Sequence, residues 1–162
     1  SKWIEDRDMK SKTILASLAM FLAGFALCMA SDLNMGTWKL NEAKSKFSPG
    51  AVRNNTVVYE SAGDSVKVTV DGVDSEGKPA HSEWTGKFDG KDYPLVGDPD
   101  ADTRAYKTVD ARTTNLVNKK AGKVTATGQI VIAADGKSRV LTVDQTDAAG
   151  KKVTSTFVYD KQ

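Results

Sequence analysis

The chain is poor in the residues that most often carry chemistry in proteins. Its 162 residues include one cysteine, Cys28, and one histidine, His81. A single cysteine excludes a disulfide framework within these residues. With so few nucleophiles and bases, the sequence offers no recognisable acid–base or nucleophilic apparatus. We therefore expect a protein that is not an enzyme and that needs no cofactor.

The chain also lacks an excess of charge of one sign. The 23 lysines and arginines nearly balance the 21 aspartates and glutamates, which leaves a formal charge of +2. Nucleic-acid binding usually requires a basic patch or stripe, so we expect no nucleic-acid partner. The length fits one domain rather than two.

The N-terminal stretch differs in composition from the rest. Lys10 and Lys12 precede an uncharged run over residues 13–30, which ends in small residues at Ala30. A basic head, a short apolar core and a small residue at the end are typical of a secretory signal peptide. We place this peptide at residues 9–30 and predict a periplasmic or secreted protein with no membrane span after cleavage.

Met9 is then the expected start of translation, residues 1–8 are an upstream artefact or tag, and residues 31–162 form a single mature domain. Two alternatives concern the leader. An uncleaved anchor needs about 20 apolar residues, a length that the run reaches only when its Ser, Thr and Gly residues are counted. A lipoprotein would be acylated at Cys28, but Leu27 is larger than the residue expected before an acylated cysteine.

The remaining sequence alternates between apolar and polar residues with a period of two. The alternation is clear at residues 66–70, 80–88, 124–132 and 153–159. Because successive side chains of a strand point to opposite faces, each run predicts a strand with one apolar face. Pairs typical of tight hairpin turns separate the runs: Gly63-Asp64, Gly77-Lys78, Asp89-Gly90, Gly122-Lys123, Asp135-Gly136 and Gly150-Lys151.

These runs predict an all-β domain of eight to ten strands. The only helical feature we expect is one turn over residues 41–46, with Asn41 as its cap. Residues 68–78 and 141–151 echo each other and predict two hairpins with the same loop design. A sheet with one apolar face and no covering helix must curl into a barrel or fold into a sandwich. Sequential hairpins favour an antiparallel up-and-down meander that closes into a barrel, and a β-sandwich is the alternative.

The start of the β domain carries a short motif, Gly36-Thr37-Trp38. Together with the hairpin meander, it resembles the lipocalin and calycin barrels. The resemblance implies a lipocalin-like barrel in which Trp38 is the structural plug of the closed end and packs under a basic residue of a late strand. Arg139 and Lys161 are both candidates for that residue. The chain lacks the disulfide and C-terminal helix common in lipocalins.

A longer resemblance covers most of the mature domain. Residues 36–50, 89–94 and 159–161 together resemble a group of exported bacterial proteins of unassigned function. This resemblance implies export from a bacterial cell and brings no activity with it.

Four aromatic residues on the apolar faces are the candidate ligand-binding side chains: Trp84, Phe88, Phe157 and Tyr159. Small residues share these faces and leave space beside the rings: Ala80, Ser82, Gly86, Ala126, Gly128 and Ser155. A small barrel is filled by its own side chains or encloses one small ligand. A cavity of about 300 Å³ or more would favour the ligand.

We therefore expect an exported lipocalin-like protein that binds a small, mainly apolar ligand in the barrel interior. If the aromatic rings instead fill the interior as core, the alternative is a structural or protein-interaction component of the bacterial cell envelope.

Two further groups have weaker functional interpretations. Asp98, Asp100 and Asp102 alternate in a loop and are a weak candidate for a calcium site, although the residues that follow depart from the EF-hand pattern. We expect no metal site elsewhere. His81 falls on the polar face with Glu83 and is expected to be an exposed side chain without a catalytic role.

Overall fold

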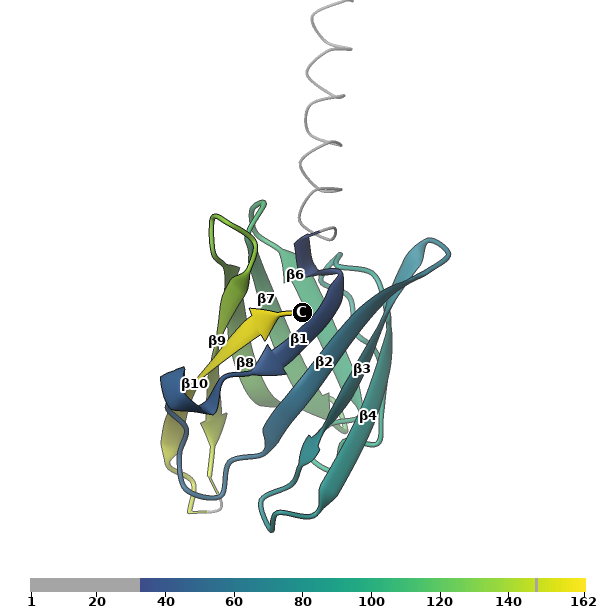
Figure 1. Cartoon of the computed structure of the whole chain (residues 1–162). Coiled ribbons are helices and arrows are strands. Elements are labelled where there is room, and N and C mark those ends of the chain that lie inside the picture. The colour runs from purple at the N-terminus through teal and green to yellow at the C-terminus, as the bar shows by residue number, and fades with distance from the viewer. Residues whose placement is uncertain (1–32, 148) are drawn as a thin grey trace, which may run out of the picture.

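Ten strands follow one another around a closed barrel in residues 33–147 and 149–162, the part of the chain that the computed structural model describes (Figure 1). The strands are β1 (Gly36–Leu40), β2 (Arg53–Ala62), β3 (Ser65–Val73), β4 (Pro79–Gly86), β5 (Tyr93–Val96), β6 (Thr103–Thr108), β7 (Thr113–Lys120), β8 (Lys123–Ile132), β9 (Ser138–Thr146) and β10 (Lys152–Lys161). Each strand pairs antiparallel with the next one along the chain, and β10 pairs with β1. The predicted up-and-down barrel is confirmed, and the alternative of a sandwich is wrong.

The predicted leader lies outside the described residues. This holds for the upstream segment 1–8, the signal peptide 9–30 and Cys28 within it. In the part of the chain that is described, no helix is both long and apolar enough to cross a membrane.

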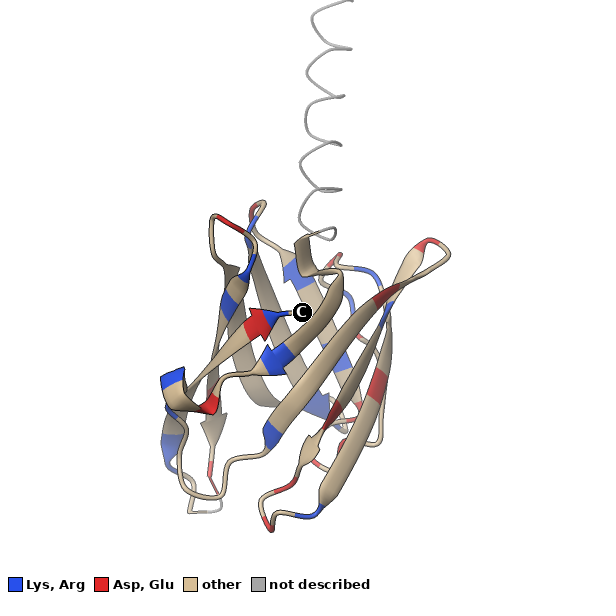
Figure 2. Cartoon of the chain, viewed as in Figure 1, with Lys and Arg blue, Asp and Glu red and all other residues tan. Residues whose placement is uncertain are grey.

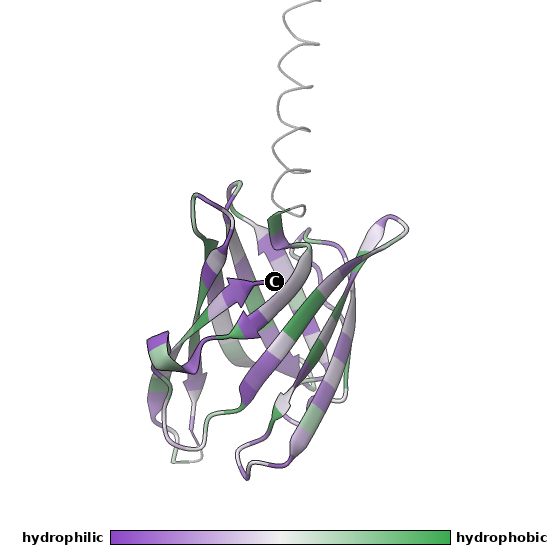
Figure 3. Cartoon of the chain, viewed as in Figure 1, coloured by the Kyte–Doolittle hydropathy of each residue, from purple (hydrophilic) through white to green (hydrophobic). Residues whose placement is uncertain are grey.

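The period-two alternation translates directly into burial. In β4, Ser82, Trp84 and Gly86 are buried, while the residues between them are exposed. Hydrophilic and hydrophobic bands alternate along the strands in Figure 3. Basic and acidic residues are interspersed over strands and loops in the view of Figure 2. The inward faces of the strands are therefore mainly apolar, and the outer surface carries mixed charge.

The two repeated hairpins share one loop design, as their sequences predict. Oδ1 of Asp74 accepts hydrogen bonds from the backbone N–H groups of Glu76 and Lys78, at 2.8 and 2.9 Å. Oδ1 of Asp147 accepts the equivalent bonds at the other hairpin, both at 2.9 Å. The expected helical turn is also present as the 3-10 helix η1 (Glu42–Lys44), capped by Asn41.

One strand departs from the expected alternation. The sequence places Val124 on the same face as Ala126, but Val124 is 58% exposed whereas Ala126 is buried. Asn118 pairs with Ala126 and Lys119 pairs with Val124, so Thr125 is an extra residue without its own partner. Such a β-bulge reverses the facing of the residues on one side of it.

Trp38 closes one end of the barrel. The side chain is fully buried, and its Nε1–H donates to the carbonyl oxygen of Asn34 at 2.7 Å. The guanidinium of Arg139 lies 4.6 Å from the indole centroid, and Nζ of Lys161 lies 5.2 Å from it. Both candidate basic residues therefore contact Trp38. They differ in burial, because Arg139 is 2% exposed while Lys161 donates to the carbonyl oxygen of Leu33 near the surface.

Candidate ligand-binding cavity

The barrel encloses a cavity of about 710 Å³. This volume exceeds the size of about 300 Å³ at which small-molecule sites begin. The cavity reaches the loops at the end of the barrel opposite Trp38, where Val52, Asp74, Asp98 and Asp147 line it. The interior is thus closed at one end and open at the other, which is the geometry of a binding cup.

Aliphatic side chains from five strands form the apolar part of the wall: Val57, Val70, Leu116, Ile130, Leu141 and Val143. Phe157 continues this wall on β10 and stacks on Phe47, with ring centroids 5.7 Å apart. These residues face inward because each occupies the apolar position of its strand's alternation. An apolar ligand body would bury its surface against them.

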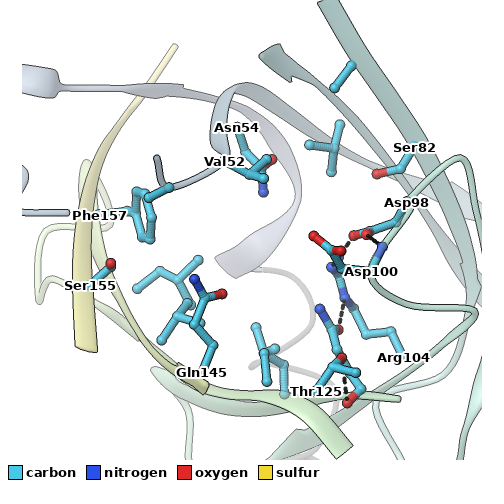
Figure 4. Close-up of a pocket in the computed structure, with 18 of the residues that line it drawn as sticks. Val52, Asn54, Ser82, Asp98, Asp100, Arg104, Thr125, Gln145, Ser155 and Phe157 are labelled. Atoms are coloured by element: carbon cyan, nitrogen blue, oxygen red, sulfur yellow. Dashed lines mark hydrogen bonds and ion pairs between the residues drawn. The ribbon is translucent and has the colours of Figure 1, made fainter. Parts of the chain in front are cut away.

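Polar side chains gather nearer the opening. Figure 4 shows Asn54, Ser82, Thr125, Gln145 and Ser155 around the cavity, together with Asp98, Asp100 and Arg104. Of the small residues expected to leave space, four line the cavity: Ala80, Ser82, Ala126 and Ser155. The cavity therefore combines an apolar wall with a polar rim.

Two arginines and three tyrosines also line the cavity, and we call them the phenol–guanidinium cluster: Tyr59, Arg104, Tyr106, Arg139 and Tyr159. Nη1 of Arg104 donates to the hydroxyl of Tyr106 at 3.3 Å. The guanidinium of Arg139 lies 5.0 Å from the ring centroid of Tyr59 and 4.9 Å from that of Tyr159. All five side chains are less than a tenth exposed.

Burial keeps the phenols of Tyr59 and Tyr159 protonated. Desolvation raises the pKa of Tyr159 to about 12, although the charge of Arg139 opposes the shift. Desolvation also raises the pKa of Tyr59 well above its ordinary value, again against Arg139. Protonated phenols can both donate and accept hydrogen bonds. The interior therefore presents neutral hydroxyl donors beside two permanent cations.

Only part of the predicted ligand-binding set lies at the cavity. Phe157 and Tyr159 line it, but Trp84 and Phe88 do not. Trp84 is 1% exposed, and its ring packs on those of Phe88 and Tyr106 at 6.1 and 4.8 Å between centroids. These two aromatic residues belong to the packed wall of the barrel. The alternation predicted which face of the sheet each residue occupies, but it could not predict which side chains surround the residue on that face.

Trp84 is held in this packing by a hydrogen bond and by a glycine. Its Nε1–H donates to the carbonyl oxygen of Arg104 at 2.8 Å. A Cβ at Gly86 would lie 2.4 Å from Cγ of Tyr93, whose ring meets that of Trp84 edge-on. Gly86 therefore makes room for the ring of Tyr93 rather than for a ligand.

The aspartates of the β5–β6 loop contact different partners. Oδ1 of Asp98 accepts from the backbone N–H of Asp100 at 2.9 Å, and Oδ2 of Asp98 lies 3.9 Å from Nη2 of Arg104. Asp102 accepts from the backbone N–H of Ala121 at 2.9 Å. Among the described residues, no group of three or more His, Cys, Asp or Glu side chains is placed to hold a metal ion. The three aspartates of this loop are thus not gathered into such a group.

His81 is on the outer surface, as predicted. Its Nδ1 lies 2.6 Å from Oδ1 of Asp71, and its Nε2 lies 3.5 Å from Oε1 of Glu83. The hydrogen bond with Asp71 raises the pKa of His81. The side chain is half exposed and takes part in a surface ion-pair group with these two carboxylates.

Sequence reasoning did not single out Tyr59, Arg104 or Tyr106. The spacing of these residues could have shown that they face inward. Arg104 and Tyr106 are two residues apart on one strand and therefore share a face, as do Val57 and Tyr59 on another strand. An arginine at an inward position is easily taken for a surface residue, since arginines are mostly exposed.

Comparison with known protein families found no match, and neither did comparison with curated proteins. Three solved structures align over most of the chain. EF1p2_mFAP2b bound to DFHBI is 12% identical, with a TM-score of 0.48, over 85% of this chain and 100% of that one. The redesigned β-barrel b11L5F_LGL is 14% identical, with a TM-score of 0.45, over 85% and 98% of the two chains. The redesigned β-barrel mFAP1 bound to DFHBI is 14% identical, with a TM-score of 0.39, over 83% and 99%. At this level of similarity we transfer neither ligand nor function to this chain.

Proposed function

We propose that this protein is a non-enzymatic, lipocalin-like binder that holds a small, mainly apolar molecule inside its barrel. The cavity of about 710 Å³, open at one end and plugged by Trp38 at the other, is the observation that carries the proposal. The alternative, an interaction component of the cell envelope, predicts an interior filled by its own side chains. A cavity of this size favours the binder.

The proposal includes export from a bacterial cell to the periplasm or beyond. Its support is the basic head and apolar run before Ala30, which are typical of a signal peptide, and the resemblance to exported bacterial proteins. A bound ligand carried by the protein in its own compartment should survive gentle purification. Native mass spectrometry of protein purified from its own host is expected to show a copurified small molecule.

A cavity-blocking variant tests binding directly. Nile red, a neutral dye whose fluorescence rises in apolar surroundings, is titrated against the full chain. Ala126→Phe adds a ring at a buried, cavity-lining position of β8. Val124→Phe adds the same ring two residues away, where the side chain is 58% exposed.

We expect saturable binding to the wild type and to Val124→Phe, with binding to Ala126→Phe weakened at least about tenfold because the added ring occupies ligand space. Circular dichroism establishes that both variants fold. Absence of saturable binding to the wild type, or equal binding by the two variants, contradicts an interior site.

A further inference from the structure

One buried cation at the cavity has no carboxylate partner among the described residues. Arg139 is 2% exposed, and it forms no ion pair with any carboxylate of the described residues. Its Nε and Nη1 are buried and have no hydrogen-bond partner there. Aromatic rings surround this guanidinium on the sides of Trp38, Tyr59 and Tyr159. A buried cation is costly unless it is paired, so the site favours an added anion.

Arg104 is paired only weakly. Its Nε donates to Oδ1 of Asn118 at 2.7 Å and its Nη1 donates to the Tyr106 hydroxyl, both neutral acceptors. Its nearest carboxylate, that of Asp98, is 3.9 Å away and also accepts from the backbone of Asp100. Figure 4 shows Arg104 and Asp98 together beside the polar rim. Of the two guanidinium groups, Arg104 thus has one carboxylate partner at 3.9 Å, and Arg139 has none among the described residues.

The two arginines are parts of one connected group. The Arg139 guanidinium lies 5.0 Å from the ring centroid of Tyr59, Tyr59 also interacts electrostatically with Arg104, and the Tyr106 hydroxyl accepts from Arg104. These side chains line the same cavity as the aliphatic wall. A guanidinium presents a fork of donors that matches a carboxylate, and protonated phenols supply further donors.

We propose that the natural ligand is an amphipathic monocarboxylate, with its carboxylate held by the phenol–guanidinium cluster and its apolar body against the aliphatic wall. This proposal rests on the proposed function and adds the charge of the ligand's head group. One carboxylate would supply the charge partner that Arg139 lacks, and the aliphatic wall gives an alkyl or aryl body an apolar surface to bury.

The test compares two ligands that differ only in the head group. Decanoate and decan-1-ol carry the same alkyl chain, and each is used at pH 8 to displace Nile red from the full chain. We expect decanoate to bind at least about tenfold more tightly than decan-1-ol, since hydrogen bonds to charged groups are the stronger ones.

Three variants locate the preference. Arg104→Met and Arg139→Met each replace one cation by an apolar side chain of similar length and are expected to reduce the preference for decanoate to about threefold or less. Lys107→Gln removes an exposed positive charge from the same strand as Arg104 and should leave the preference unchanged. Two arginine variants are used so that, if one of them fails to fold, the other still tests whether the cluster binds the carboxylate.

The outcomes separate this proposal from the proposed function. Equal binding of decanoate and decan-1-ol overturns the carboxylate site and leaves an interior binder. An undiminished preference in both arginine variants also overturns it, as does an equal loss in Lys107→Gln. If neither compound displaces Nile red and the dye itself does not bind, the proposed function fails with it.

Discussion

Replacing Trp38 by alanine measures how much the closed end of the barrel depends on one side chain. The indole is fully buried and donates a hydrogen bond to Asn34. Removing a buried tryptophan costs about 3–5 kcal/mol, and the contacts with the Arg139 and Lys161 cations add about 1 kcal/mol. We therefore expect Trp38→Ala to lower the free energy of unfolding by about 4–6 kcal/mol, much of the 5–15 kcal/mol typical of a domain.

Urea unfolding followed by far-ultraviolet circular dichroism gives this free energy for the full chain. Trp38→Phe keeps a ring under Arg139 but loses the N–H donor, so we expect a smaller loss of about 1–2 kcal/mol. Val96→Ala is the control, because Val96 is 68% exposed and its truncation should change stability by less than about 0.5 kcal/mol. A loss below about 2 kcal/mol for Trp38→Ala, or equal losses for the alanine and phenylalanine variants, would refute the role of Trp38 as the plug.

Two further predictions concern the wall and the outer surface. Gly86→Ala places a Cβ against the ring of Tyr93, and we expect urea unfolding to show a loss of about 1–3 kcal/mol, whereas Thr85→Ala on the outer face should change little; equal effects would contradict the packing described. The pKa of His81 is raised, first by its hydrogen bond with Asp71, so this pair stabilises the fold below the ordinary histidine pKa and the contribution disappears as the pH rises through the higher folded value. NMR titration should show the pKa of His81 fall in Asp71→Asn, and an unchanged value would count against the pair.

The alternation of apolar and polar residues predicted the strands, and the turn pairs between the runs favoured a barrel over a sandwich. Every long alternating run became a strand, and the hairpin loops at Asp74 and Asp147 formed as their shared sequence predicted. What alternation could not show was the extra residue Thr125, because a bulge depends on how two strands pair. Val124 consequently faces outward, against the sequence pattern.

The candidate site was predicted only in part, for a related reason. Periodicity assigned Trp84 and Phe157 to the same kind of face, but the packing around each residue depends on its neighbours across several strands. Trp84 meets Tyr93 and Tyr106 and packs tightly, whereas Phe157 borders open space. The buried Arg104 had no signal beyond its place in the alternation, since its partners come from other segments of the chain.

Both ends of the described chain meet the barrel on the side of its plug. Asn34 accepts a hydrogen bond from the Trp38 indole, and the backbone N–H of Gln162 donates to the carbonyl oxygen of Thr37 at 3.0 Å. A tag or fusion partner attached directly before Leu33 or after Gln162 therefore lies at the closed end of the barrel. It lies away from the open end of the cavity. Immobilising the protein through its C-terminus should leave its entrance facing the solution.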